Sequence, residues 1–238
     1  MDFSFRKLSH IGVFILLIVS FLVFIVAPIL SFFGFTSSYT GSDSIRVGEV
    51  FLLIIQFILV FILFVLIPLL WYRVVNHFDK QKIFDSIKLK VENVDLVLVW
   101  GVITAIIAFI VIVSIGIVLN FFGFDVSKSS NITDLKHFFS IPSMMILIVV
   151  QPFAEEFFFR GFLLDKLTGV LGSANAIIIT SILFGLAHLS YGNIYPALMT
   201  GIVGFILAIL VVRTKNLYTS IIAHILFNII SFSIYFIG

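Results

Sequence analysis

The chain has 238 residues, of which 61% are hydrophobic and 11% are charged, and its net charge is +2. A soluble domain carries about 25% charged residues, so this composition excludes an ordinary soluble domain and indicates a membrane protein. The sequence has no cysteine, which excludes disulfide bonds, thiol nucleophiles and cysteine metal ligands.

Apolar runs long enough to cross a bilayer as helices, about 20 residues each, recur along the sequence. They predict an all-α, polytopic membrane protein with about seven transmembrane helices. The fifth run is short, so an eighth helix or a re-entrant segment is the alternative. The seven runs lie near residues 10–35, 48–72, 95–122, 141–166, 174–189, 194–212 and 217–237.

The positions of lysine and arginine predict the orientation in the membrane. With the amino terminus inside, most cations fall on one side of the membrane, and only Arg46, Lys128 and Lys136 fall on the other. The positive-inside rule then predicts a cytoplasmic amino terminus and an outward carboxyl terminus.

The sequence predicts two parts. Residues 1–140 form an N-terminal transmembrane scaffold of three spans with a charged cytoplasmic loop at 73–94. That loop alternates lysine with apolar residues, so we expect either an amphipathic helix on the inner surface or a solvated connector. In residues 141–238, small residues become frequent, which lets helices approach closely around a shared site. We expect the catalytic domain here.

Two adjacent glutamates, Glu155 and Glu156, interrupt the apolar run of residues 144–160. An ionised carboxylate in hydrocarbon costs several kcal/mol, so the pair indicates function. Arg160 lies four residues after Glu156, which predicts an ion pair that frees Glu155 for chemistry. The two glutamates are about 100° apart around the helix axis, so they do not point equally at one spot. Pro152 removes a helical hydrogen bond just before them.

Two later runs bring histidines to a similar depth. At about 1.5 Å per residue, Glu155 and Asn228 lie roughly 16 Å from the inner side, His188 about 21 Å and His224 about 10 Å. His224 and Asn228 are one helical turn apart and share a face, as do Phe184 and His188. The sequence therefore predicts a polar site in the middle of the membrane.

These residue types fit two kinds of hydrolytic chemistry. Glu155 with His188 can deprotonate a water, while His224 and Asn228 can stabilise the oxyanion formed when that water attacks a carbonyl. Alternatively, Glu155, His188 and His224 can hold a divalent metal such as zinc. The chain lacks the His-Glu-x-x-His and Gly-x-Ser-x-Gly motifs of other hydrolases.

At these residues the chain resembles the CAAX-processing and bacteriocin-processing (Abi) intramembrane proteases, also called type II CAAX prenyl endopeptidases. The resemblance covers residues 141–232. It rests on three motifs, which are Glu-Glu-x-x-x-Arg at Glu155, Glu156 and Arg160, Phe-x-x-x-His at Phe184 and His188, and His-x-x-x-Asn at His224 and Asn228.

The resemblance implies a multi-pass endopeptidase with a site open to the cytoplasmic side. Glu155 and His188 would activate water, His224 and Asn228 would stabilise the oxyanion, and Glu156 with Arg160 would shape the site. The family is described both as metal-dependent and as metal-free, so no cofactor is firmly expected and zinc stays an alternative.

The expected partners are a membrane-associated peptide or protein substrate and the lipid bilayer, with no nucleic acid. The bias towards Ile, Phe, Lys and Asn is typical of a low-GC bacterium, so we expect a location in a bacterial plasma membrane. Two other functions compete with peptide hydrolysis. One is a non-catalytic role through protein contacts, in bacteriocin immunity or surface-protein display, and the other is proton-coupled transport through the glutamates.

Overall fold

The computed structural model describes residues 3–33, 46–124, 139–189 and 194–237, and these residues form helices joined by short connections. Its α-helices are α1 (Leu8–Phe21), α2 (Ala27–Phe32), α3 (Arg46–Phe61), α4 (Ile67–Leu70), α5 (Lys80–Ser86), α6 (Val94–Phe121), α8 (Ile141–Glu156), α9 (Leu164–Leu186), α10 (Tyr195–Thr214) and α11 (Leu217–Ile237). Four π-helical segments continue them, η1 (Leu22–Val26), η2 (Ile62–Leu66), η3 (Trp71–Val75) and η4 (Phe157–Leu163).

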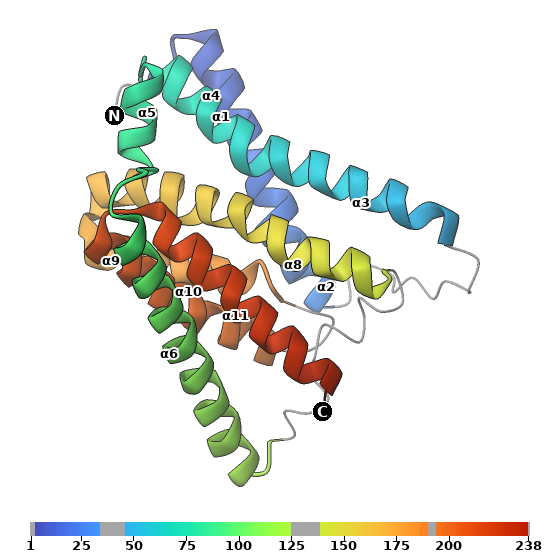
Figure 1. The fold of residues 1–238 in the computed structure, drawn as a ribbon. Helices are drawn as coiled ribbons and strands as arrows, with labels where there is room; N and C mark the ends of the chain where they lie inside the picture. The colour runs from blue at the N-terminus through green and yellow to red at the C-terminus, as the bar shows by residue number, and fades with distance from the viewer. Residues whose placement is uncertain (1–2, 34–45, 125–138, 190–193, 238) are drawn as a thin grey trace.

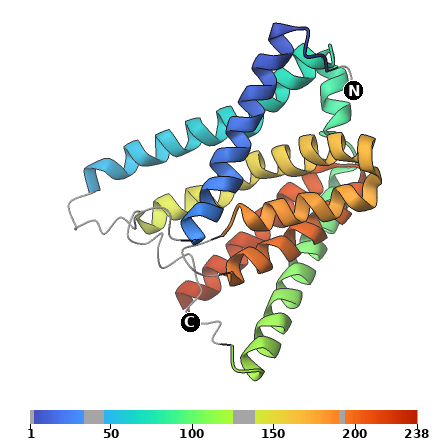
Figure 2. The same ribbon diagram turned by 180° about the vertical axis from the view of Figure 1, so that it is seen from behind.

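Six helical stretches in the described residues are long and apolar enough to span a bilayer. This confirms an all-helical, multi-pass membrane protein, although seven spans were expected. The fourth stretch, Ile141–Leu186, contains both the predicted fourth and fifth runs. Within this stretch, the φ of 78° and ψ of 161° at Gly172 are not helical and kink the helix. Figures 1 and 2 show that the chain turns back along α8 within α9.

Helix α8 lies between two groups of helices. Figures 1 and 2 show α3 and α4 on one side of it, and α6, α10 and α11 on the other. The third span, α6, thus lies beside the C-terminal helices and packs closely on α11, where a Cβ on Gly101 would meet Ile222 Cγ2 at 2.7 Å. The division of the chain at residue 140 stays a prediction.

The outer faces of the spans carry exposed apolar side chains. On α6, for example, Val99, Ile106 and Ile110 are 52%, 48% and 57% exposed. Because lipid offers no hydrogen bonds, a helix that satisfies its own backbone and presents such side chains is the stable form for these runs.

The charged loop contains the short amphipathic helix α5. Asp79 caps it by accepting a hydrogen bond from Lys82 N at 2.8 Å. Ile83 is buried, and so is Ile87, which directly follows the helix, whereas Lys80 and Lys82 are exposed. This part of the loop is therefore an amphipathic helix and not a fully solvated connector.

The three cations expected on the other side of the membrane are not placed by the structure. Lys128 and Lys136 lie outside the described residues, and so does the side chain of Arg46. The orientation of the amino terminus therefore stays a prediction.

Helices α9 and α10 touch through their backbones at Gly185 and Gly201. A Cβ on Gly185 would lie 2.6 Å from the carbonyl oxygen of Ala197 and 3.2 Å from Gly201 Cα. Small residues allow this approach in membrane helices. It matters for function because α9 carries Phe184 and α10 carries Gly204, both next to the site described below.

Substituting Gly185→Ala is expected to destabilise the fold by about 1–3 kcal/mol, because overpacking against a backbone carbonyl forces two helices apart. The midpoint of thermal unfolding in detergent would measure this effect. The matched control is Gly169→Ala in the same helix, where a Cβ meets nothing within 4 Å. Equal stability of the two variants would contradict the close contact.

Candidate active site

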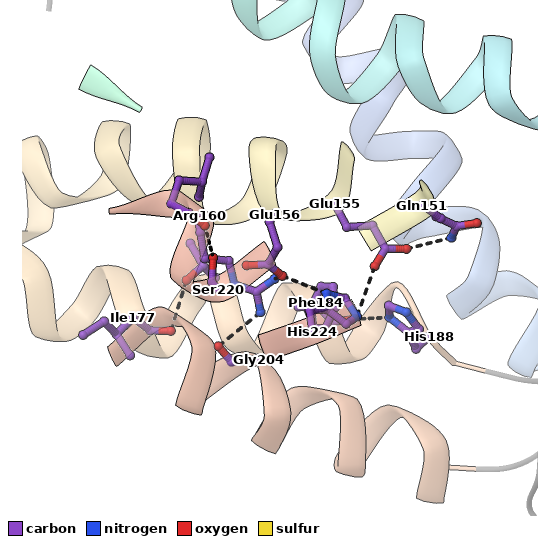
Figure 3. A network of polar contacts seen from close by, with 12 residues as sticks. Gln151, Glu155, Glu156, Arg160, Ile177, Phe184, His188, Gly204, Ser220 and His224 are labelled. Carbon is purple, nitrogen blue, oxygen red and sulfur yellow. Dashed lines mark hydrogen bonds and ion pairs between the residues drawn. The ribbon is translucent and has the colours of Figure 1, made fainter. Parts of the chain in front are cut away.

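The buried end of α8 supplies three polar side chains from consecutive turns. Glu155 is 6% exposed and Glu156 is fully buried. Gln151, one turn earlier, donates a hydrogen bond from Nε2 to Glu155 Oε1 at 2.7 Å (Figure 3). The helix continues through Pro152 and becomes π-helical from Phe157, a form that often occurs at functional sites.

Glu156 is held by a buried arginine. Arg160 is also fully buried and donates from Nη1 to Glu156 Oε1 at 2.6 Å, which confirms the ion pair expected from the sequence. Its Nη2 donates to the carbonyl oxygen of Gly204 on α10 at 3.1 Å. Its guanidinium carbon also lies 4.2 Å from the centre of the Phe184 ring. These contacts fix Arg160 between α9 and α10.

His224 on α11 lies between the two glutamates. Its Nδ1 is 3.0 Å from Glu156 Oε1, and its Nε2 is 3.8 Å from Glu155 Oε2. The carboxylates therefore face opposite ring nitrogens of one histidine, as Figure 3 shows. Although the two glutamates point about 100° apart around α8, both reach His224 because its ring presents one nitrogen to each carboxylate. The sequence did not predict this arrangement.

The geometry of His224 fixes one of its protons. An ionised carboxylate accepts hydrogen bonds and does not donate them, so Nδ1 carries a proton toward Glu156. The 3.8 Å from Nε2 to Glu155 is too long for a direct hydrogen bond. Nε2 is therefore available to another group.

His188 has the complementary arrangement at the end of α9. Its Nδ1 is 2.8 Å from the carbonyl oxygen of Phe184, which can only accept. Nδ1 is then the donor, and the neutral ring keeps a lone pair on Nε2. The centre of the Phe184 ring lies 4.7 Å from that of the His188 ring and 5.8 Å from that of the His224 ring, so Phe184 packs against both histidines.

A cavity of about 450 Å³ joins these groups. Glu155, His188, His224 and Asn228 all line it, so the structure brings together the four residues expected to perform chemistry. Glu156 and Arg160 do not line it and lie behind His224. Most of the remaining wall is apolar, and it is formed by Phe139, Met144, Leu147, Ile148, Pro152, Phe184, Val203, Phe227 and Phe232.

The alternative metal site would use Glu155, His188 and His224. Within the described ranges, no three His, Asp or Glu side chains are grouped so that they could hold a metal ion. His224 uses Nδ1 for Glu156, and only its Nε2 faces Glu155. These side-chain positions do not fit a three-ligand site, and no step proposed below uses a metal.

Sequence reasoning missed the roles of Gln151, Gly204 and Thr200. Gln151 could have been found, because an amide four residues before a buried glutamate shares its helical face. Gly204 contributes a backbone carbonyl to Arg160, and Thr200 lines the cavity from α10. Neither position carries a sequence signal, since their roles depend on how α10 packs.

Replacing Gln151→Leu is expected to lower the turnover number about 10–100-fold with little change in KM. A hydrogen bond to a charged group is worth about 1.5–3 kcal/mol, and its loss leaves Glu155 free to leave its working position. The rate of peptide cleavage over a range of substrate concentrations would separate the two constants.

The matched control for this prediction is Gln56→Leu. Gln56 lines the same cavity, and in the described part of the chain no hydrogen bond joins it to Glu155. A similar loss of turnover in both variants would show that cavity polarity, and not the position of Glu155, is what matters.

The fold and the cavity define a class: a multi-pass membrane protein with a buried Glu, His and Asn site inside its helices. Residues 137–230 match the family described as type II CAAX prenyl endopeptidase Rce1-like. The C-terminal part of the chain therefore belongs to the Rce1-like family, and the resemblance expected from the three motifs is confirmed. No curated protein and no solved structure matches the chain.

This family match extends over α8, η4, α9 and α10 and over most of α11, which are the elements that form the site. The family matched by these residues is one of CAAX-type membrane endopeptidases. The roles of individual residues are taken up next.

Proposed function

We propose that the protein is an intramembrane endopeptidase that hydrolyses a peptide bond in a membrane-associated peptide or protein precursor. The observation that carries this proposal is the meeting of Glu155, His188, His224 and Asn228 in one largely apolar cavity. A carboxylate base, a histidine with a free lone pair and two potential hydrogen-bond donors are the groups that water attack on an amide requires.

Glu155 and His188 activate the water. The water donates one hydrogen bond to Glu155 and one to His188 Nε2, and Glu155 removes a proton as the oxygen attacks the carbonyl carbon. The carbon–nitrogen bond then breaks, and the protonated Glu155 gives its proton to the leaving amine. Glu155 thereby returns to the carboxylate form, and the products are a carboxylic acid and an amine.

His224 and Asn228 stabilise the oxyanion. Donation from His224 Nε2 requires a proton there, and since Nδ1–H already points at Glu156, the ring is then an imidazolium. The two glutamates that flank this ring, together with Arg160, balance the charge of the site. Asn228 donates from its side-chain amide to the same oxygen.

Glu156 acts as a positioning residue in this scheme. Its carboxylate holds His224 Nδ1, and Arg160 holds the carboxylate. This is the relation in which a buried acid orients a histidine for catalysis. We further propose a bacterial plasma membrane as the location, with the amino terminus in the cytoplasm, and a peptide precursor as the substrate.

The test compares peptide termini in membranes that contain the wild type, Glu155→Ala or His188→Ala, measured by mass spectrometry. Loss of the same cleaved termini in both variants at equal protein levels would support the protease and name its substrate. An unchanged set of termini would contradict it. Substrate flux across liposomes without new termini would instead indicate the transporter, and a phenotype retained by both variants would indicate a role through protein contacts.

A further inference from the structure

A second large cleft lies between α6 and α10, away from the candidate active site. Its volume is about 720 Å³, and the two cavities share no lining residue. One face of α6 forms one wall with Leu96, Trp100 and Ile107, and Ile206 and Ile209 of α10 form the other. The proposed peptidase chemistry therefore does not involve this cleft.

The cleft has the length of one leaflet. From Leu96 to Ile107, the first and last apolar residues of α6 that line the cleft, the helix rises about 16 Å, at about 1.5 Å per residue. The hydrocarbon core of a bilayer is about 30 Å thick, so a single leaflet is about 15 Å. Trp100 and Ile107 are 49% and 48% exposed, so this apolar wall is open to whatever surrounds the protein in the membrane.

The polar end of the cleft is cationic. Lys90, Arg213 and Lys215 line it, together with the single carboxylate of Glu92. Lys90 lies 3.6 Å from Asp85, which offsets its charge in part. Arg213 and Lys215 are exposed and form no ion pair with any part of the chain that the structure describes.

The cationic end is held in place by the backbone. Asn216 donates from Nδ2 to the carbonyl oxygen of Lys90 at 2.9 Å, and Leu217 N donates to the carbonyl oxygen of Lys88 at 2.8 Å. These bonds tie the segment before α6 to the turn between α10 and α11. The cations therefore stand at a fixed place above the apolar walls.

We propose that this cleft binds a phospholipid with an anionic head group from the leaflet on the side of Arg213 and Lys215. The head group lies against these two cations, and an acyl chain lies along Trp100 between α6 and α10. Charge complementarity selects the anionic head group, and the one-leaflet length of the walls fits the acyl chain. By the predicted orientation, this is the cytoplasmic leaflet.

Trp100 supplies a direct probe of this site. The chain has two tryptophans, and the other, Trp71, is buried and stacked on Phe3 at 5.6 Å. In a Trp71→Phe protein reconstituted in phosphatidylcholine bilayers, emission therefore comes from Trp100 alone. Lipids brominated on the acyl chain quench this emission when they occupy the cleft.

We expect brominated phosphatidylglycerol to reach half-maximal quenching at about a tenfold lower mole fraction than brominated phosphatidylcholine, since each cation near a membrane surface contributes attraction to anionic lipid. Excess unbrominated phosphatidylglycerol should restore the emission. In Arg213→Gln/Lys215→Gln, the difference between the two lipids should disappear. The matched control, Lys80→Gln/Lys82→Gln, removes two exposed cations of α5 outside the cleft and should keep the difference.

Equal quenching by the two brominated lipids would overturn the proposal, and so would a preference that persists in the Arg213→Gln/Lys215→Gln protein. Recovery of emission by a lipid-modified peptide, but not by phosphatidylglycerol, would also overturn it and would assign the cleft to a substrate. None of these measurements depends on peptidase activity, so they test the lipid site independently of the proposed function.

Discussion

Replacing Glu155 with glutamine is expected to lower the rate of peptide hydrolysis by about 10²–10⁴-fold, the range that a positioned general base contributes. Glutamine has nearly the same shape and still accepts a hydrogen bond from Gln151, but it cannot take a proton from water. KM should change little, because the side chain lies at the reacting atoms in the proposed mechanism. Cleavage of a reporter peptide by purified protein would measure the effect.

The matched control is Asp95→Asn, which changes an exposed carboxylate at the start of α6. It should keep wild-type activity. Helical content and thermal unfolding of Glu155→Gln should equal those of the wild type, so that loss of activity reports chemistry. A Glu155→Gln protein that keeps more than about one tenth of the wild-type rate would exclude Glu155 as the base.

Much of the site could be predicted because the membrane makes polar residues informative. In an apolar run, a carboxylate is costly enough that its presence alone marks a site, and this singled out Glu155 and Glu156. Helical periodicity then gave the contact between Glu156 and Arg160, which the structure has at 2.6 Å. The depth estimated along antiparallel spans predicted that His188 lies in the same layer of the membrane as Glu155, and both residues line one cavity.

The rest depended on tertiary packing. Helical periodicity predicted that the two glutamates point in different directions, but it says nothing about how α11 packs on α8. The position of His224 between both carboxylates therefore could not be predicted. The carbonyl of Gly204 reaches Arg160 only because α10 approaches η4 closely. The turn between the predicted fourth and fifth runs also depended on the backbone, because the non-helical φ and ψ of Gly172 kink the long helical stretch that contains both runs.

Removing the charge of Arg160 from its buried ion pair with Glu156 is expected to give the largest loss of stability. Arg160→Met keeps the length and apolar stem of the side chain but removes the charge between Glu156 and the Gly204 carbonyl. A buried carboxylate that loses its partner costs about 3–5 kcal/mol. Unfolding by SDS in mixed micelles, followed by circular dichroism, would measure it, with the exposed Arg6→Met as the matched control.

The double variant Glu156→Gln/Arg160→Met separates charge from packing. It removes both charges, while the glutamine oxygen still accepts from His224 Nδ1. Because replacing both members of a buried pair is often close to neutral, the double variant should be more stable than Arg160→Met alone. If it is equally unstable, the contact of Arg160 with Gly204 and Phe184, and not its charge, holds these helices together. If it is stable and still inactive, the charges of Glu156 and Arg160 are needed for activity and not only for stability.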